Sequence, residues 1–176
     1  MVIFETDRLV VREWLDKDKL DFYQLSADAD VMKFFPSTLS TIECDRVIQR
    51  IKSLNEKNGF CFWSCEEKQS KKFIGLAGLN KIDSELPFAP SVEIGWRFKK
   101  DYWGQGYASE AAKGCLAYGF KQLALNEIVS FAVKTNIKSI KVMERIGMTN
   151  TMKNFIHPKV ELAHLKEHVL YKISPI

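Results

Sequence analysis

The sequence predicts an α+β domain whose central sheet is mixed, mostly antiparallel, has six to seven strands and is flanked by helices. Three observations favour this class. Short runs rich in β-branched and aromatic residues recur between polar turns, as is typical of strands. Two segments, Thr41 to Lys57 and Ala108 to Leu123, carry apolar stripes at helical spacing. Residues 92–133 form a strand–helix–strand unit, which requires two near-parallel strands.

The first half of the chain alternates strands and helices. Asp16 is a favourable helix N-cap, and Asn58 with Gly59 ends the next helix. The polar run 68–72 is the turn of a hairpin. The predicted elements are, in order, a strand over 8–14, a helix over 16–26, a loop or short helix over 28–37, a helix over 41–57, and strands over 60–66 and 73–82.

The second half begins with a loop over residues 85–90, which contains two prolines. A short helix near residue 140 is predicted to be capped by Asn136 and closed by Gly147. The predicted elements are, in order, a strand over 92–98, a glycine turn, the helix over 108–123, a strand over 127–133, the short helix over 139–145, and strands over 148–155 and 168–173.

Size and composition indicate one domain over residues 1–176 with a substantial core. The net charge of +4 is too small to indicate a nucleic-acid partner, and no block of like charges occurs. No apolar run approaches the ~20 residues that span a bilayer, so we expect no membrane association. The start of the sequence does not resemble a signal peptide, which predicts a cytoplasmic protein.

The four cysteines do not predict a metal site. Cys61 and Cys65 lie four apart, but no second pair stands at metal-site spacing. We therefore interpret all four, Cys44 and Cys115 included, as reduced, buried thiols.

A glycine turn directly precedes the longest helix of the second half. Gly104 and Gly106 flank Gln105, and glycine adopts positive φ angles at little cost. Unpaired N–H groups and the helix dipole make such a helix start a site for anions. The sequence therefore predicts that a phosphate-bearing ligand binds at residues 103–109.

Two common phosphate-binding loops do not fit this turn. The nucleoside-triphosphate loop, Gly-x-x-x-x-Gly-Lys-Ser/Thr, does not occur. The dinucleotide loop, Gly-x-Gly-x-x-Gly, fits Gly104 and Gly106 but would require a glycine at Ser109. The acidic residue that should follow would be Glu127, which precedes the next apolar run instead of following it. A dinucleotide-dependent oxidoreductase is therefore a weak interpretation.

The segment Trp103 to Ala108 resembles the pyrophosphate loop of the GNAT superfamily of acetyl-CoA-dependent N-acetyltransferases. A Trp at the first place is similar to the branch that contains the ribosomal-protein N-terminal acetyltransferases. The resemblance extends to Thr6 to Glu13, to Asn136 to Ser139 and to Met143 to Met148, in the family's order. It implies a three-layer α/β/α fold in which the two near-parallel strands splay apart around the cofactor.

The resemblance implies transfer of an acetyl group from acetyl-CoA to a primary amine, by direct attack in a ternary complex. The acceptor would be a protein or peptide N-terminus or a small-molecule amine, and no metal would be required. The enzyme would be a monomer or a homodimer. The alternative is a non-catalytic acyl-CoA-binding sensor or interaction module. Met143 keeps it open, because many members have a Tyr there and methionine cannot donate a proton.

The resemblance also implies the residues that hold acetyl-CoA. Backbone N–H groups of the glycine turn would bind the pyrophosphate, and the end of the strand before it would bond the pantetheine arm. The backbone N–H of Phe98 would stabilise the oxyanion. Asn136 resembles a pantetheine-binding residue, although it equally suits a helix cap. The full set is Trp96, Arg97, Phe98, Trp103, Gly104, Gln105, Gly106, Tyr107, Ala108, Ser109 and Asn136.

Two residues are candidates for proton transfer. Glu93 lies on an apolar strand, where burial would raise the pKa of its carboxyl group toward the working pH of a general base. The other interpretation of Glu93 is a structural hydrogen bond to a neighbouring strand. Ser139 would protonate the departing thiolate, or it would only cap a helix.

Three residues are candidates for contacting the acceptor. His157 precedes a proline in a loop that we expect to flank the acceptor pocket, although a loop histidine is commonly just solvated. Phe35 and Trp63 would line the pocket, or they would be ordinary core residues.

Overall fold

The computed structural model describes residues 1–83 and 85–175. Its strands are β1 (Val2–Glu5), β2 (Leu9–Arg12), β3 (Phe62–Glu67), β4 (Phe73–Ile82), β5 (Ser91–Phe98), β6 (Ile128–Val133), β7 (Thr149–Asn150), β8 (Phe155–Ile156) and β9 (Glu167–Ile173). Its α-helices are α1 (Asp18–Ala27), α2 (Thr41–Asn58), α3 (Tyr107–Lys121) and α4 (Ile137–Arg145), and short 3₁₀ turns cover Lys100–Tyr102 and Ala163–Leu165.

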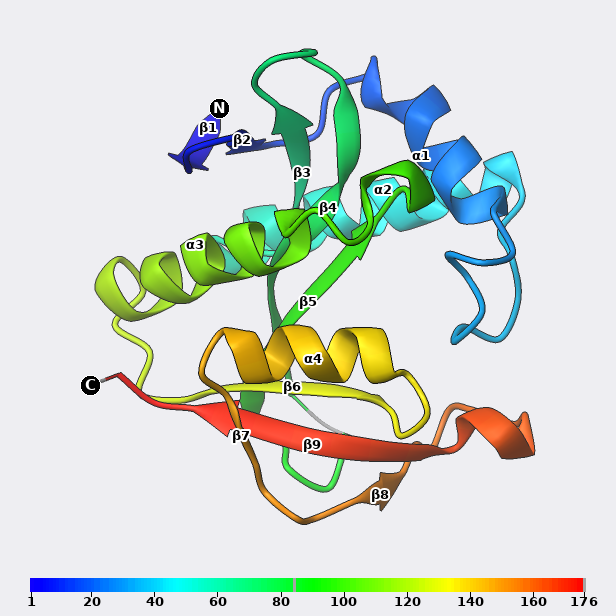
Figure 1. The fold of residues 1–176 in the computed structure, drawn as a ribbon, viewed down its shortest axis with the longest axis vertical. Coiled ribbons are helices and arrows are strands. Elements are labelled where there is room, and N and C mark those ends of the chain that lie inside the picture. The colour runs from blue at the N-terminus through cyan, green and yellow to red at the C-terminus, as the bar shows by residue number, and fades with distance from the viewer. Residues whose placement is uncertain (84, 176) are drawn as a thin grey trace.

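The strands form one sheet in the order β1-β2-β3-β4-β5-β6-β9-β7, with β8 also paired to β9. All pairs are antiparallel except β5 with β6. Helices α3 and α4 lie in front of the sheet and α2 lies behind it (Figure 1). The predicted α+β class with a mixed, mostly antiparallel sheet is therefore confirmed.

The described residues form nine strands, which is more than the six to seven expected. One addition is β1, a four-residue strand that pairs with β2 and is too short to show a periodic pattern. The other arises because the single strand expected over 148–155 is split into β7 and β8. Met152, with a φ of +59°, turns the chain between them, so that both pieces pair with β9.

Helix α1 begins at Asp18, not at the expected cap Asp16. Asp18 is buried and its carboxylate accepts hydrogen bonds from the Leu15 N–H, at 2.9 Å, and from Arg12, at 2.7 Å. Arg12 also pairs with Glu66 on β3, at 2.8 Å. A buried carboxylate needs such partners, so this network places the start of the helix where no local pattern predicts it.

The core has one large cluster on each face of the sheet. Under α3 it contains Ile94, Phe98 and Cys115, and under α1 and α2 it contains Phe22 and Ile48. The predicted apolar stripe of α3 is confirmed, since its buried residues are those at helical spacing. All four cysteines are buried and free of disulfides, as expected.

Strands β5 and β6 separate shortly after they meet. Their register contains the pair Glu93 and Val129, and the Ser130 hydroxyl donates to the Ile94 carbonyl at 3.0 Å. Beyond that point β5 stays paired with β4 as far as Phe98, while β6 pairs with β9. The two strands diverge in Figure 1. The splay that the resemblance implied is present, and it opens the sheet beside Trp96 and Phe98.

Candidate active site

The glycine loop has the backbone that a phosphate site requires. Gly104 and Gly106 have φ angles of +74° and +85°, which glycine alone adopts without strain. Gly106 is the N-cap of α3 and provides no side-chain hydrogen bond to the first turn. The N–H groups at the start of α3 are therefore oriented for an anionic ligand.

Arg8, in the turn between β1 and β2, holds this loop in place. Its guanidinium donates to the Gln105 carbonyl at 2.9 Å and to the Glu110 carboxylate at 2.7 Å, and it lies 4.2 Å from the centre of the Tyr107 ring. We did not single out Arg8 from the sequence. The available signal was its place in the segment Thr6 to Glu13, which carries part of the family resemblance.

The start of α4 lies against the same loop. The Asn136 side chain accepts a hydrogen bond from the Ser139 N–H at 3.3 Å, so Asn136 is a helix cap. The Lys138 ammonium lies 4.0 Å from the centre of the Trp103 ring, which brings the first turn of α4 to the glycine loop. Met143 points away from this region into the core, where it is 1% exposed.

The end of β5 faces the opening between the strands. The Lys99 N–H donates to the Ile74 carbonyl on β4, whereas the Ile94 carbonyl accepts a bond from the Ser130 hydroxyl on β6. Backbone groups alternate in direction along a strand. The odd-numbered residues of β5 therefore turn their N–H and C=O groups toward β4, and the even-numbered residues turn theirs away from it. Trp96 and Phe98 therefore present backbone groups to the opening. The Phe98 carbonyl accepts a hydrogen bond from Trp103 Nε1 at 2.9 Å, which leaves its N–H as the donor on this side.

Arg97 differs from its neighbours on β5, because its backbone turns toward β4. Its guanidinium lies 4.4 Å from the centre of the Phe35 ring and 3.2 Å from Met32 Sδ, and burial lowers the pKa of Arg97 to about 10. The structure thus places the Arg97 side chain under the loop between α1 and α2, away from the glycine loop.

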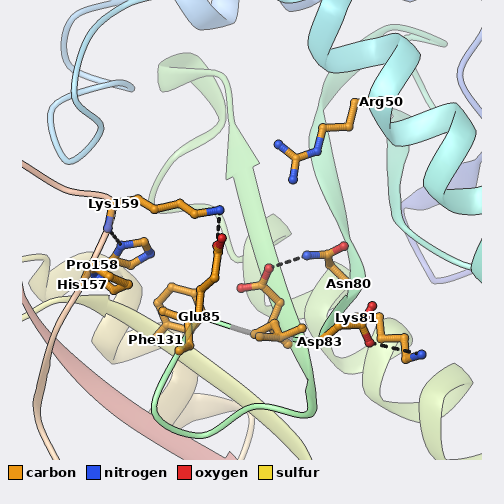
Figure 2. Close-up of a pocket in the computed structure, with 12 residues that line it drawn as sticks. Arg50, Asn80, Lys81, Asp83, Glu85, Phe131, His157, Pro158 and Lys159 are labelled. Carbon is orange, nitrogen blue, oxygen red and sulfur yellow. Dashed lines mark hydrogen bonds and ion pairs between the residues drawn. The ribbon is translucent and has the colours of Figure 1, made fainter.

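A pocket of about 450 Å³ lies where β5 and β6 meet (Figure 2). Glu93 lines it, and its Oε1 accepts a hydrogen bond from Asn80 Nδ2 at 2.8 Å. Burial raises the pKa of Glu93, and the bond from Asn80 opposes that shift only in part. The lining residues are Arg50, Asn80, Lys81, Ile82, Asp83, Glu85, Leu86, Glu93, Phe131, His157, Pro158 and Lys159.

Of the three predicted acceptor contacts, the structure brings only His157 to this pocket. Burial, and then the nearby His168, lower the pKa of His157, and its Nδ1 accepts the Lys159 N–H at 3.2 Å. Phe35 lies over Arg97 instead. Trp63 is 1% exposed and packs edge-on against Tyr118 of α3, with ring centres 5.3 Å apart, so it is a core residue.

Of the twelve residues that line the pocket, sequence reasoning singled out only Glu93 and His157. Among those it missed, Asn80 and Arg50 bear most on the chemistry. Asn80, which is bonded to Glu93, is a polar residue in an apolar strand, and that contrast was the signal that could have found it. Arg50 is an exposed residue of α2 and carried no signal. Within residues 1–83 and 85–175, no His, Cys, Asp and Glu side chains form a group of three that could hold a metal, and no helix is long and apolar enough to cross a bilayer.

Comparison with known proteins identifies the family. The Acetyltransferase (GNAT) domain family matches residues 8–149. The uncharacterized N-acetyltransferase YnaD of Bacillus subtilis (strain 168) is 34% identical over 144 residues, which cover 81% of this chain and 80% of YnaD. The crystal structure of a GNAT-family acetyltransferase from Bacillus anthracis has a TM-score of 0.83 and 26% identity, over 99% of this chain and 98% of that chain.

A third comparison shows the fold alone. RimL, described as a ribosomal L7/L12 alpha-N-protein acetyltransferase and solved in complex with coenzyme A, has a TM-score of 0.77 at 14% identity, over 99% of this chain and 98% of RimL. The match over residues 8–149 and the identity to YnaD go further than fold. The chain therefore belongs to the GNAT family of acetyltransferases and is an acyltransferase.

Proposed function

We propose that this protein transfers an acetyl group from acetyl-CoA to a primary amine held in the pocket at Glu93. The observation that carries the proposal is the position of Glu93. It stands at the residue pair where β5 and β6 meet, it lines the pocket, and its pKa is raised by burial. A carboxyl group with a raised pKa at the mouth of the splay suits a general base for an amine.

The residues of the glycine loop fit coenzyme A. Gly104 and Gly106 have the left-handed backbone that turns N–H groups toward a pyrophosphate, and a Cβ at Gly106 would come within 3.4 Å of the Arg8 guanidinium. The opening beside Trp96 and Phe98 suits the pantetheine arm, with backbone groups available for its amides. When bound, acetyl-CoA supplies an acyl thioester, whose carbonyl carbon an amine can attack directly.

The chain's own groups would then act at three atoms. Glu93, directly or through a water molecule, takes the proton that the acceptor amine must lose. The Phe98 N–H donates to the carbonyl oxygen as it gains negative charge. Ser139, at the start of α4 beside the glycine loop, provides a hydroxyl proton for the thiolate. Asn136 supports this arrangement by capping the helix that carries Ser139.

A calorimetric titration with acetyl-CoA, followed by measurement of free CoA release over a panel of amines and N-terminal peptides, tests the proposal. We expect micromolar binding, about −8 kcal/mol, and release that requires an amine. Replacement of Ser139 by Ala should lower the release rate while leaving the binding unchanged. Release that proceeds equally without any amine would contradict the proposal.

The second candidate is a non-catalytic acyl-CoA sensor. The burial of Met143 favours it, because no side-chain proton donor stands at that place of α4. A sensor would bind acetyl-CoA with the same affinity but release no CoA with any amine, and the Ser139 substitution would then change nothing in either assay.

A further inference from the structure

We infer that the acceptor is a free amino acid with an apolar side chain, whose carboxylate is bound by Arg50. This inference rests on the proposed function, because it names the substrate class of the pocket at Glu93. It follows from the charges that the pocket leaves unmatched, from the four apolar residues of its lining and from its size.

Apart from His157, the pocket has three basic side chains, and two of them are already neutralised. Lys81 pairs with Asp83 at 3.2 Å, and Lys159 pairs with Glu85. Figure 2 shows both pairs. Among the described residues Arg50 has no ion-pair partner, and Figure 2 shows its guanidinium directed into the pocket from α2.

Two of the three acidic side chains of the pocket are likewise paired, and one is not. Asp83 and Glu85 are occupied by the two lysines, so they do not form a free anionic surface for a polyamine. Glu93 remains, bonded only to the neutral Asn80 among the described residues. The pocket therefore has one unmatched cation, Arg50, facing one acid that we assign to the amine.

A zwitterion matches both groups at once. Its ammonium gives up a proton toward Glu93, and its carboxylate accepts two parallel N–H bonds from the planar guanidinium of Arg50. Arginine favours this bidentate geometry with carboxylates. A peptide N-terminus would place a neutral amide where the carboxylate stands, and would leave Arg50 unmatched.

The rest of the lining is mixed, because four apolar residues stand beside Asn80 and His157. The four apolar residues are Ile82, Leu86, Phe131 and Pro158. Phe131 also contacts His157, with ring centres 6.0 Å apart, and burial lowers the pKa of that imidazole, which favours its neutral form. A volume of about 450 Å³ is at the small end of ligand pockets. These features suit one amino acid whose side chain is aliphatic or aromatic.

The test uses matched acceptors and matched variants. L-phenylalanine, L-phenylalaninamide and spermidine would be compared by kcat/KM for CoA release in the wild type, in Arg50→Gln and in Arg46→Gln. Arg46 is an exposed cation one turn earlier on α2 and is not among the residues that line the pocket. We expect the wild type to prefer the acid over its amide by about tenfold, the value of a charged hydrogen bond.

Arg50→Gln should lower kcat/KM for L-phenylalanine about tenfold. It should leave kcat/KM for L-phenylalaninamide unchanged, so that the preference for the acid over its amide is lost. Arg46→Gln should keep the preference for the acid. Spermidine should be the poorest acceptor in all three proteins. A preference for spermidine or for the amide in the wild type, or a preference for the acid that survives in Arg50→Gln, would overturn the inference while leaving the transferase in place.

A binding arm separates this inference from the proposed function. Each protein would be saturated with CoA and titrated with L-phenylalanine, and the backbone amide resonances of the protein would be followed by NMR to obtain the Kd. Weaker binding in Arg50→Gln alone would support the inference even if no acceptor released CoA, in which case only the catalytic proposal fails. Equal binding by Arg50→Gln and the wild type would overturn the inference whatever the kinetics show.

Discussion

The glycine loop and the pocket at Glu93 differ in how the chain builds them. The loop is one continuous segment, residues 103–109, and it presents backbone N–H groups. The pocket takes its walls from α2, β4, the loop between β4 and β5, β5, β6 and the loop after β8, and it presents side chains. The proposed acetyl-CoA site at the loop should therefore respond to changes of backbone conformation, and the proposed amine site in the pocket to changes of side-chain chemistry.

Glu93→Gln should produce the largest difference between the effect on the reaction rate and the effect on acetyl-CoA binding. This change keeps the shape and the bond to Asn80 but removes the base, so kcat should fall about 100-fold or more. The Kd for acetyl-CoA, measured by calorimetry, should stay within twofold because the glycine loop is untouched. Glu85→Gln is the matched control, since Glu85 lines the same pocket but is paired with Lys159. Equal losses in the two variants would assign Glu93 a structural role.

The converse change is Gly106→Ala in the glycine loop. A Cβ at a φ of +85° strains the backbone by about 1–2 kcal/mol, and relief of the strain would turn the N–H groups away from the ligand. The Kd for acetyl-CoA should rise about tenfold, while the KM for the amine changes little.

Gly59→Ala is the control for backbone strain. Gly59 caps α2 at a φ of +81° with nothing within 4 Å of an added Cβ, far along the chain from the glycine loop. Both variants should lose similar thermal stability, but only Gly106→Ala should lose affinity for acetyl-CoA. Loss of affinity in both would show that global destabilisation, rather than loop geometry, is being measured.

A smaller effect is expected from Arg8→Met, which keeps the length of the side chain but removes its bonds to Gln105 and Glu110. The Arg8 side chain is 43% exposed, so solvent weakens these contacts. The Kd for acetyl-CoA should rise about threefold, in keeping with a surface ion pair. The rate with saturating donor and amine should not change, and a fall in that rate would place Arg8 closer to the chemistry than its contacts indicate.

The smallest effect concerns pH. Because burial raises the pKa of Glu93 in the folded protein, the folded state binds this proton more tightly than the unfolded state. The free energy of unfolding of the wild type, relative to Glu93→Gln, should therefore fall as the pH rises from the ordinary glutamate range through the raised pKa.

Activity should follow the opposite trend. The base must be ionised, so kcat/KM should rise with pH over the window in which Glu93 loses its proton. The pH–rate profile of Gly106→Ala should rise over the same pH range as that of the wild type, because this change lies in the glycine loop and not in the pocket at Glu93. Urea unfolding across pH and a pH–rate profile measure the two trends, and a stability difference that is constant with pH would exclude a raised pKa.

The sequence predicted the helices better than the sheet margins. The long periodic stripes of α2 and α3 were recognised at nearly their observed bounds. Strand β1 and the division between β7 and β8 were not, since these pieces of two to four residues exist only through pairing with β2 and β9. The start of α1 was missed because the buried pairing of Asp18 with Arg12 outweighs the local preference for Asp16 as a cap.

The same contrast applies to the site. The glycine loop, the helix after it and the apolar surroundings of Glu93 could be predicted, because adjacent residues fix the local backbone and its N–H groups. The bond between Asn80 and Glu93 needs the register of β4 on β5. The places of Phe35 and Trp63 depend on tertiary packing, of Phe35 against Arg97 and of Trp63 against Tyr118.

By itself, the sequence determined the α+β class, the glycine turn at residues 103–109 that we propose binds an anion, and the carboxylate on the strand before it. Each of these follows from backbone preference and periodicity within a short segment. The tertiary structure alone decided that Arg50 and His157 share a pocket with Glu93 and that Arg8 supports the loop. These contacts join segments far apart in the chain, and only packing of the whole sheet brings such segments within hydrogen-bonding distance.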